Sequence, residues 1–171
     1  MMELNLDFIK AEGFKNETEN HQFRTFLKQH SAAKIDKIAH AIYEKVNAEI
    51  DCTQCGNCCK KLMPSPTASE IETLSKKTGY DSPDAFKIDL LQFDAKDQAY
   101  FFKSKPCSFL ENNCCTVYED RPQSCRDYPN LHKKDFIFRM LSVIGNYGIC
   151  PIVYNTLEQL KGEMGFKREK N

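Results

Sequence analysis

The sequence predicts a mainly α-helical fold with a short β-hairpin, in which a small cysteine-rich domain held together by metal follows a helical hairpin. Three observations support this prediction. Apolar residues recur at helical spacing near both ends of the chain. Aromatic residues flank a polar segment in the middle, as in a β-hairpin. Nine cysteines among 171 residues are a cysteine-rich composition, and eight of them lie between residues 52 and 125.

The first 50 residues contain no cysteine and predict two helices. These run from about Glu17 to His30 and from about Ala33 to Ile50, with Ser31 as the cap of the second helix. Their apolar stripes are expected to face a core. The histidines of this region have no second ligand one helical turn away, so we expect them to be structural or solvated. They are His21, His30 and His40.

After the first cysteines, a capping box at Thr67 opens a helix that ends at Gly79. A short helical turn is predicted over residues 83–87. Two aromatic-rich runs, residues 90–93 and 99–102, are then predicted to pair as a hairpin.

The last third of the chain predicts three further helical pieces. Pro122 starts a short turn of helix that presents Cys125 on a rigid element. A longer pattern covers about residues 135–144, and a last helix begins at Cys150 and Pro151.

This element order suggests three segments. Residues 1–50 form an N-terminal helical extension packed on the core, and residues 51–153 form a cysteine-cluster metal-binding domain. Residues 154–171 form a C-terminal helix and tail, in which Lys167 to Lys170 are expected to be solvated.

Charge and hydropathy argue against two classes of function, nucleic-acid binding and membrane association. Lysine and arginine equal aspartate and glutamate at 24 residues each, so no net charge draws the protein to nucleic acid or to an anionic membrane. The sequence has no run of about 18 apolar residues, and its beginning lacks the features of a secretory signal. We therefore expect a soluble cytoplasmic protein, with no nucleic-acid or membrane partner. In a reducing cytoplasm, clustered cysteines are more often metal ligands than disulfides.

Residues 52–59 carry the pattern Cys-x-x-Cys-Gly-x-Cys-Cys. Two C-x-x-C steps can aim several thiolates at one point, and Gly56 permits a tight turn between them. Because neighbouring side chains diverge on a helix or a strand, Cys58 and Cys59 rarely bind one ion together. The run is therefore expected to be one half of a shared site.

The second block of cysteines and Cys150 supply further ligands. Eight thiolates suit two four-ligand sites, or one cluster with the remaining thiols structural or redox-active. Both zinc and iron, the latter including an iron–sulfur cluster, accept four cysteines at such spacing. The predicted metal ligands are Cys52, Cys55, Cys58, Cys59, Cys107, Cys115, Cys125 and Cys150.

Two choices around this set stay open. Cys114 is the expected extra cysteine, although the adjacent pair Cys114 and Cys115 leaves the ligand between them unassigned. Arg121 and Arg126 flank Cys125 and are candidate cofactor-binding residues that offset thiolate charge. The alternative is that they are ordinary surface arginines. Without metal, the region beyond Cys52 is expected to have little apolar core, so that folding and metal binding are coupled.

These motifs resemble the CxxCxxCC family, also called YkgJ-type cysteine cluster proteins. The resemblance covers about residues 51–153 and implies a zinc- or iron-chelating protein. It also implies that the eight predicted ligands occupy the family's cysteine positions. A more distant resemblance connects such clusters with flagellin lysine N-methylases. The motifs that carry the family resemblance are Cys52-x-x-Cys55-Gly56-x-Cys58-Cys59, Cys107-x-Phe109-Leu110, Cys115-Thr116-Val117-Tyr118-Glu119-Asp120-Arg121-Pro122-x-x-Cys125-Arg126-x-Tyr128-Pro129 and Cys150-Pro151.

Three functions remain open at this point. The first is a metal-binding accessory protein, in which zinc or an iron–sulfur centre organises a surface for a protein partner. The second is an iron–sulfur redox or group-transfer protein, and the third is metal storage or delivery. We find no catalytic base, phosphate-binding loop or methyl-donor motif, which favours a role without catalysis.

Overall fold

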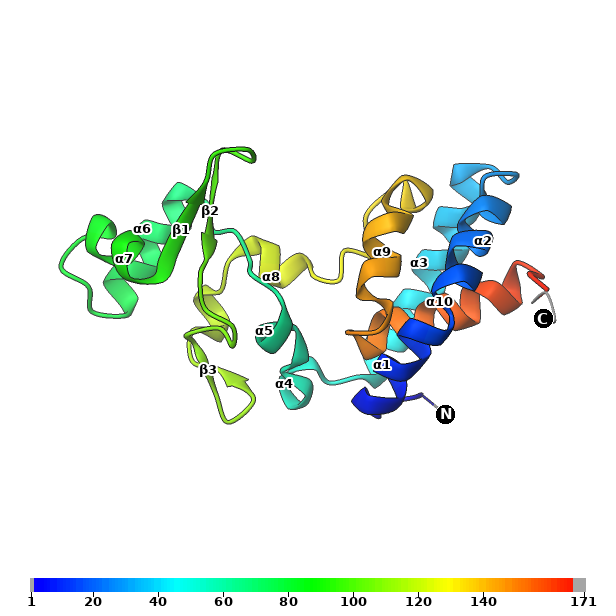
Figure 1. Cartoon of the computed structure of the whole chain (residues 1–171), viewed down its shortest axis with the longest axis horizontal. Helices are drawn as coiled ribbons and strands as arrows, with labels where there is room; N and C mark the ends of the chain where they lie inside the picture. Colours follow the sequence, from blue (N-terminus) through cyan, green and yellow to red (C-terminus); the bar gives the residue numbers. More distant parts are fainter. Residues whose placement is uncertain (1, 168–171) are drawn as a thin grey trace. The chain divides into compact units, whose positions relative to one another are not determined.

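The computed structural model describes residues 2–167 and confirms the predicted fold class, because it is mainly α-helical with short antiparallel hairpins (Figure 1). Its contacts divide the chain into two compact units. We call residues 1–51 and 129–171 the helical unit, and residues 52–128 the cysteine unit. The predicted solvated tail lies, beyond Lys167, outside the described residues.

Residues 129–153 group with the helical unit, although the sequence placed them in the cysteine-rich domain. The reason is that the last two helices pack on the N-terminal ones. The elements of the helical unit are α1 (Leu6–Lys15), α2 (Glu17–Leu27), α3 (Ala32–Glu49), the 3-10 helix η2 (Phe136–Arg139), α9 (Met140–Tyr147) and α10 (Pro151–Glu163).

Helix α1 is absent from the sequence prediction, which gave the first 50 residues two helices. It has one fully buried apolar residue, Ile9, so its apolar stripe is weak. Its start is nevertheless defined chemically, since the Asn5 side chain accepts hydrogen bonds from the N–H groups of Asp7 and Phe8 at 3.0 and 3.1 Å. Ser31 caps α3 as predicted, accepting from Lys34 N at 3.3 Å.

The core of the helical unit forms where α10 packs against α3. The predicted stripes supply it: Ile35, Ile42 and Val46 from α3 are buried. They meet Val153, Leu157 and Leu160 from α10, which are buried as well. Each such side chain contributes about 1.5–3 kcal/mol when fully buried.

A buried polar cluster joins α2, α9 and α10. Lys161 Nζ lies 2.7 Å from Glu19 and 2.6 Å from Glu158. The Tyr147 hydroxyl donates to Glu158 at 2.8 Å and accepts from Asn16 Nδ2 at 3.2 Å. Burial, and secondly the charge of Glu158, raise the pKa of Tyr147, so this hydroxyl stays protonated.

The cysteine unit has an apolar cluster of its own, which the sequence analysis did not expect. Its buried members come from α6, α7, the first hairpin and the segment after it, and Cys107 and Cys115 pack against its edge. They are Ile71, Leu74, Phe86, Leu91, Phe102 and Phe109.

The elements of this unit match the predicted helix after Thr67 and the predicted hairpin. The capping box is complete, with Thr67 Oγ1 accepting from Glu70 N and Glu70 accepting from Thr67 N. A second hairpin is additional to the prediction. The elements are α4 (Cys52–Cys55), α5 (Asn57–Lys61), α6 (Ala68–Lys77), α7 (Pro83–Leu90), β1 (Leu91–Asp94), β2 (Ala99–Phe102), β3 (Leu110–Glu111), β4 (Cys114–Cys115), the 3-10 helix η1 (Tyr118–Asp120) and α8 (Gln123–Asp127).

Two glycines let α1 approach the end of α9. A Cβ on Gly13 would lie 2.7 Å from Gly148 Cα, closer than carbon atoms pack. We predict that Gly13→Ala destabilises the helical unit by about 1–3 kcal/mol, because backbone must move to admit the methyl group. The matched control is Gly145→Ala in α9, where nothing lies within 4 Å of the added carbon. That variant should be stabilised by about 0.5–1 kcal/mol. Chemical denaturation followed by circular dichroism compares them, and equal stabilities would refute the close approach.

Candidate metal centre

The cysteine run folds into two short helices, α4 and α5, joined by Gly56. Gly56 adopts a left-handed conformation, with φ of 58°. Its N–H donates to Cys52 O at 3.4 Å, which closes α4, and Leu62 N donates to Cys58 O at 2.8 Å, which closes α5. The predicted tight turn at Gly56 is therefore present.

A backbone hydrogen bond connects this run to the second cysteine block. Cys107 N donates to Cys59 O at 2.8 Å. After Cys107 the chain turns, with Leu110 N donating to Cys107 O at 3.0 Å, and β3 then pairs with β4. In this hairpin Leu110 lies opposite Cys115. Cys59, Cys107 and Cys115 are thus placed by main-chain geometry.

Four thiols interact electrostatically in every pairwise combination, and we call them the central tetrad. They are half-buried, and each lies close enough to the other three for their charges to interact. Four anions at this place would repel one another, so a cation is needed to hold them as thiolates. The members are Cys59, Cys107, Cys115 and Cys125.

The pKa values of three members of the tetrad are raised, chiefly by burial and secondly by the neighbouring thiols. Burial, followed by the charges of the other three thiols, raises the pKa of Cys125 to about 12. Burial is also the main cause that raises the pKa of Cys107 and of Cys115. The pKa of Cys59 is raised as well. The largest cause is the hydrogen bond with Cys58, whose Sγ lies 4.0 Å from Cys59 Sγ, and the second is burial.

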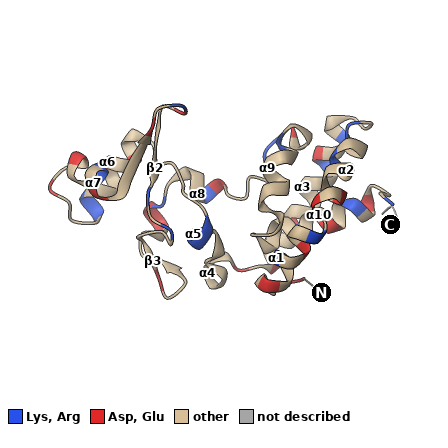
Figure 2. Cartoon of the chain, in the orientation of Figure 1, with Lys and Arg blue, Asp and Glu red and all other residues tan. Residues whose placement is uncertain are grey.

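Two cationic side chains, Arg121 and Lys60, lower the pKa values of thiols in the tetrad. Arg121, a predicted cofactor-binding residue, has a charge that favours the thiolates of Cys115 and Cys125. Its guanidinium also lies over the Tyr118 ring, 3.6 Å from the centroid. Helix α5 ends in Lys60 and Lys61 (Figure 2), and Lys60 favours the thiolate of Cys59.

Arg126, the other predicted cofactor-binding residue, supports the backbone. Its Nε donates to Arg121 O at 2.8 Å and its Nη2 to Glu119 O at 3.1 Å. It therefore bridges the turn between η1 and α8, the helix that carries Cys125.

Glu70 is a supporting residue that the sequence analysis did not identify beyond its capping role. Its second carboxylate oxygen accepts a hydrogen bond from Gln123 N at 2.7 Å, across 53 positions in the chain. Ser124 Oγ adds a bond to Ser65 O at 3.0 Å. Helix α6 and its preceding loop thus hold the start of α8. The only signal in the sequence was the capping box.

The remaining five cysteines differ in their exposure. Cys52 and Cys114 are exposed, whereas Cys55 and Cys58 are half-buried. Cys114 Sγ lies 3.9 Å from Thr53 O, within the first C-x-x-C step. Cys150 belongs to the helical unit, where it stands at the start of α10 with 7% of its surface exposed.

The donor set fits a soft metal ion. Between residues 2 and 167, no three His, Cys, Asp or Glu side chains already stand as they would around a bound ion, so binding requires the thiols to approach one another. Among the same residues, no two cysteines are joined in a disulfide. A tetrad of sulfur donors with neighbouring cationic side chains suits zinc or iron and does not suit magnesium or calcium, which prefer oxygen.

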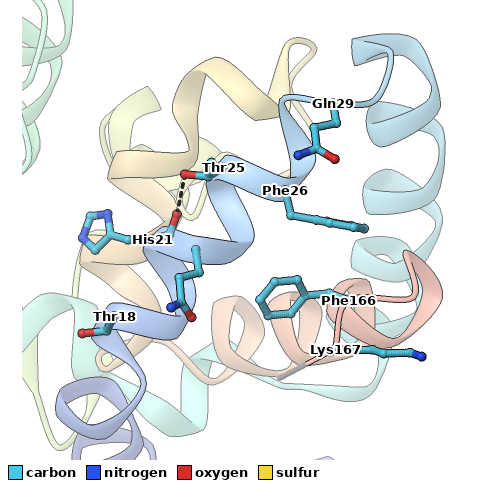
Figure 3. Close-up of a pocket in the computed structure, with 8 residues that line it drawn as sticks. Thr18, His21, Thr25, Phe26, Gln29, Phe166 and Lys167 are labelled. Atoms are coloured by element: carbon cyan, nitrogen blue, oxygen red, sulfur yellow. Dashed lines mark hydrogen bonds between the residues drawn. The ribbon is translucent and has the colours of Figure 1, made fainter. Parts of the chain in front are cut away.

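Two histidines contact main-chain carbonyls, and a pocket in the described part of the helical unit is lined without cysteine or acidic residues. His30 Nδ1 contacts Phe26 O at 3.3 Å, and His40 Nε2 contacts Lys133 O at 3.0 Å. The pocket lies in the helical unit between α2 and the segment after α10, where Phe26 and Phe166 face each other with ring centroids 5.5 Å apart (Figure 3). His21 is its one histidine, and no acidic or cysteine residue lines it.

These features define a class of protein, the metal-chelating cysteine clusters. The chain belongs to the CxxCxxCC family, described as "Putative zinc- or iron-chelating domain", whose family model matches residues 51–142. This range includes every cysteine except Cys150. No curated protein and no solved structure shows significant similarity to the chain. Within residues 2–167, none of the helices has the length and apolar character needed to cross a membrane.

Gly56 gives the first test of this site. A Cβ on Gly56 would lie 2.9 Å from Asn113 O in the β3–β4 turn. Gly79 also has a positive φ, of 78°, but nothing lies within 4 Å of its added carbon. Alanine costs about 1–2 kcal/mol of left-handed strain at either position. We predict that Gly56→Ala additionally separates α4 from the hairpin, which lowers the bound metal per chain, and that Gly79→Ala keeps it. Elemental analysis of both purified variants measures the bound metal per chain. Full metal content in Gly56→Ala would contradict the prediction.

The Glu70 carboxylate gives a second test, through pH. Burial raises its pKa, but the N–H groups of Thr67 and Gln123 outweigh burial and lower the pKa below the usual 4.5. Because the pKa of Glu70 is lower in the folded chain than in the unfolded chain, the ionised carboxylate stabilises the fold at pH values above the unfolded-state pKa. This stabilisation is lost as the pH falls through the folded-state pKa. We predict that Glu70→Gln loosens the start of α8 by about 1 kcal/mol at pH 7.

The measurement is hydrogen exchange at the Gln123 amide, with Glu72→Gln on the exposed side of α6 as the charge-matched control. The difference between wild type and Glu70→Gln should begin to shrink as pH falls below about 4.5, and it should vanish below the lowered pKa of folded Glu70, where the wild-type carboxyl is protonated as well. A difference that stays constant with pH would show that the carboxylate charge is not what holds Gln123.

Proposed function

We propose that this protein is an accessory factor that holds zinc or iron in its cysteine unit and presents the metal-ordered surface to a protein partner. One observation carries the proposal. Four half-buried thiols from separate segments lie close enough that, as thiolates, each would repel the other three, so they can ionise together only around a cation. Family membership supports chelation of zinc or iron.

The central tetrad would hold the metal through Cys59, Cys107, Cys115 and Cys125. A bound ion supplies the positive charge that lets these thiols ionise at neutral pH. Four sulfur ligands close a tetrahedral zinc site and leave no open position, which is typical of structural rather than catalytic centres. An iron–sulfur cluster takes four cysteines as well, so iron–sulfur redox chemistry is the alternative. A reducing compartment such as the cytoplasm would keep the thiols available.

The partner role rests on the surface beside the tetrad. Tyr118 is 40% exposed, and Arg121 stacks on its ring while its charge acts on Cys115 and Cys125. Tyrosine and arginine are the residues most often found at the energetic centre of protein interfaces. Metal binding would fix this pair through the segment that connects Cys115 to Cys125.

Anaerobic purification followed by metal and sulfide analysis tests the proposal. We expect stoichiometric zinc or iron, and removing it with a strong chelator should increase hydrogen exchange over residues 52–62 and 103–128. The apolar cluster of α6, α7 and the first hairpin should keep its protection, as should the helical unit, because neither depends on the thiols. Zinc without sulfide would exclude the redox alternative. A metal-free protein with unchanged exchange after chelation would overturn the proposal.

A further inference from the structure

We infer that the cysteine unit holds a second thiolate site beside the central tetrad, so that one chain takes two soft metal ions. This inference rests on the proposed function and extends it. We call the second group the outer tetrad; its members are Cys52, Cys55, Cys58 and Cys114.

The distribution of cysteines between the units gives the first argument. Eight of the nine cysteines lie in the cysteine unit, and the central tetrad uses four of them. The remaining four are three residues of the opening run and Cys114. Four sulfur donors are the number that a second tetrahedral site requires.

Cys114 is brought to the opening run by the second hairpin. Helix α4 packs against β4, and Cys114 Sγ lies 3.9 Å from Thr53 O, between Cys52 and Cys55 in sequence. The preceding residue, Asn113, lies against Gly56. The hairpin turn therefore rests on the C-x-x-C step and directs the Cys114 thiol to it.

Both adjacent cysteine pairs divide between the two groups. In strand β4, successive side chains point to opposite faces, so Cys115 packs against the apolar cluster while Cys114 meets α4. In α5, Cys59 interacts with the other members of the central tetrad, and Cys58 stands next to it at 4.0 Å. The β4 pair is therefore divided by the strand, and Cys58 is assigned to the outer tetrad because the central tetrad already has four members; each pair then supplies one thiol to each group.

This assignment differs from the sequence-based prediction at two cysteines. The sequence analysis predicted Cys150 as a metal ligand and Cys114 as the extra cysteine, whereas here Cys114 is a ligand and Cys150 is not. Cys114 lies inside the matched family range, residues 51–142, whereas Cys150 lies outside it and is buried in the helical unit. Metal binding at this site needs no redox step. A divalent ion forms four metal–sulfur bonds, and the four thiol protons are released to solvent.

The outer tetrad is also the more accessible group. Two of its members, Cys52 and Cys114, are exposed, whereas all four members of the central tetrad are half-buried. The metal of the outer tetrad should therefore be the first to leave, and chelation should proceed in two separable steps.

Zinc is the probe for the test. The full chain, stripped of metal under argon with reductant, is titrated with Zn²⁺ and its ion count is read by native mass spectrometry. We expect two zinc ions for wild type, one for Cys114→Ser, and two for the control Cys150→Ser. Alkylation with iodoacetamide, mapped by peptide mass spectrometry, gives a second readout on the unmutated chain. Cys114 should react in the stripped protein and be protected at two equivalents of zinc.

The outcomes separate the two levels of proposal. A wild-type chain that binds one zinc ion, with Cys114 equally reactive before and after loading, would overturn the outer tetrad and leave the proposed function standing. Two ions retained by Cys114→Ser, or one ion lost in Cys150→Ser, would overturn it as well. A wild-type chain that binds no zinc and carries no iron would overturn both.

Discussion

The repulsion that four closely placed cysteines would feel as thiolates is the constraint on which the cysteine unit depends. Each member of the central tetrad is held by main-chain structure: Cys59 by α5, Cys107 by its bond to Cys59 O, Cys115 by β4 and Cys125 by α8. The backbone thus brings together thiols that would repel one another once ionised. Burial first, and then the neighbouring thiolate charges, raise the pKa of Cys125 and keep it protonated in the absence of a cation.

The scaffold tolerates this constraint because it has an apolar cluster beside the tetrad. Cys107 and Cys115 pack against the edge of that cluster, so the thiols have one apolar side and one side that faces polar groups. Polar contacts of Glu70 and Arg126 then fix α8 to α6 and to η1. Helices α6 and α7 and the first hairpin therefore share an apolar core of their own, where the sequence analysis expected little.

Much of the fold could be predicted because its signals are local. The Ser31 and Thr67 caps, the hairpin over residues 91–102 and the Pro151 start of α10 each rest on residues a few positions apart. Helix α1 was missed because its apolar stripe is thin, although Asn5 marks its start. The bond from Gln123 to Glu70 could not be predicted, since 53 residues separate its partners and no pattern connects them.

The sequence shows which cysteines could act as donors but not how they are grouped in space, and the reason lies in two residues. Asn112 and Asn113 both have positive φ, of 48° and 65°, and form the tight turn between β3 and β4. Paired asparagines are a known signal for such turns, yet the two strands are only two residues long, too short for a periodic pattern. A shift of one residue in this register would exchange Cys114 and Cys115 between the faces of the hairpin. The turn therefore decides which thiol joins the central tetrad and which meets α4. Composition predicts a metal-binding protein, but the assignment of each cysteine depends on this strand register.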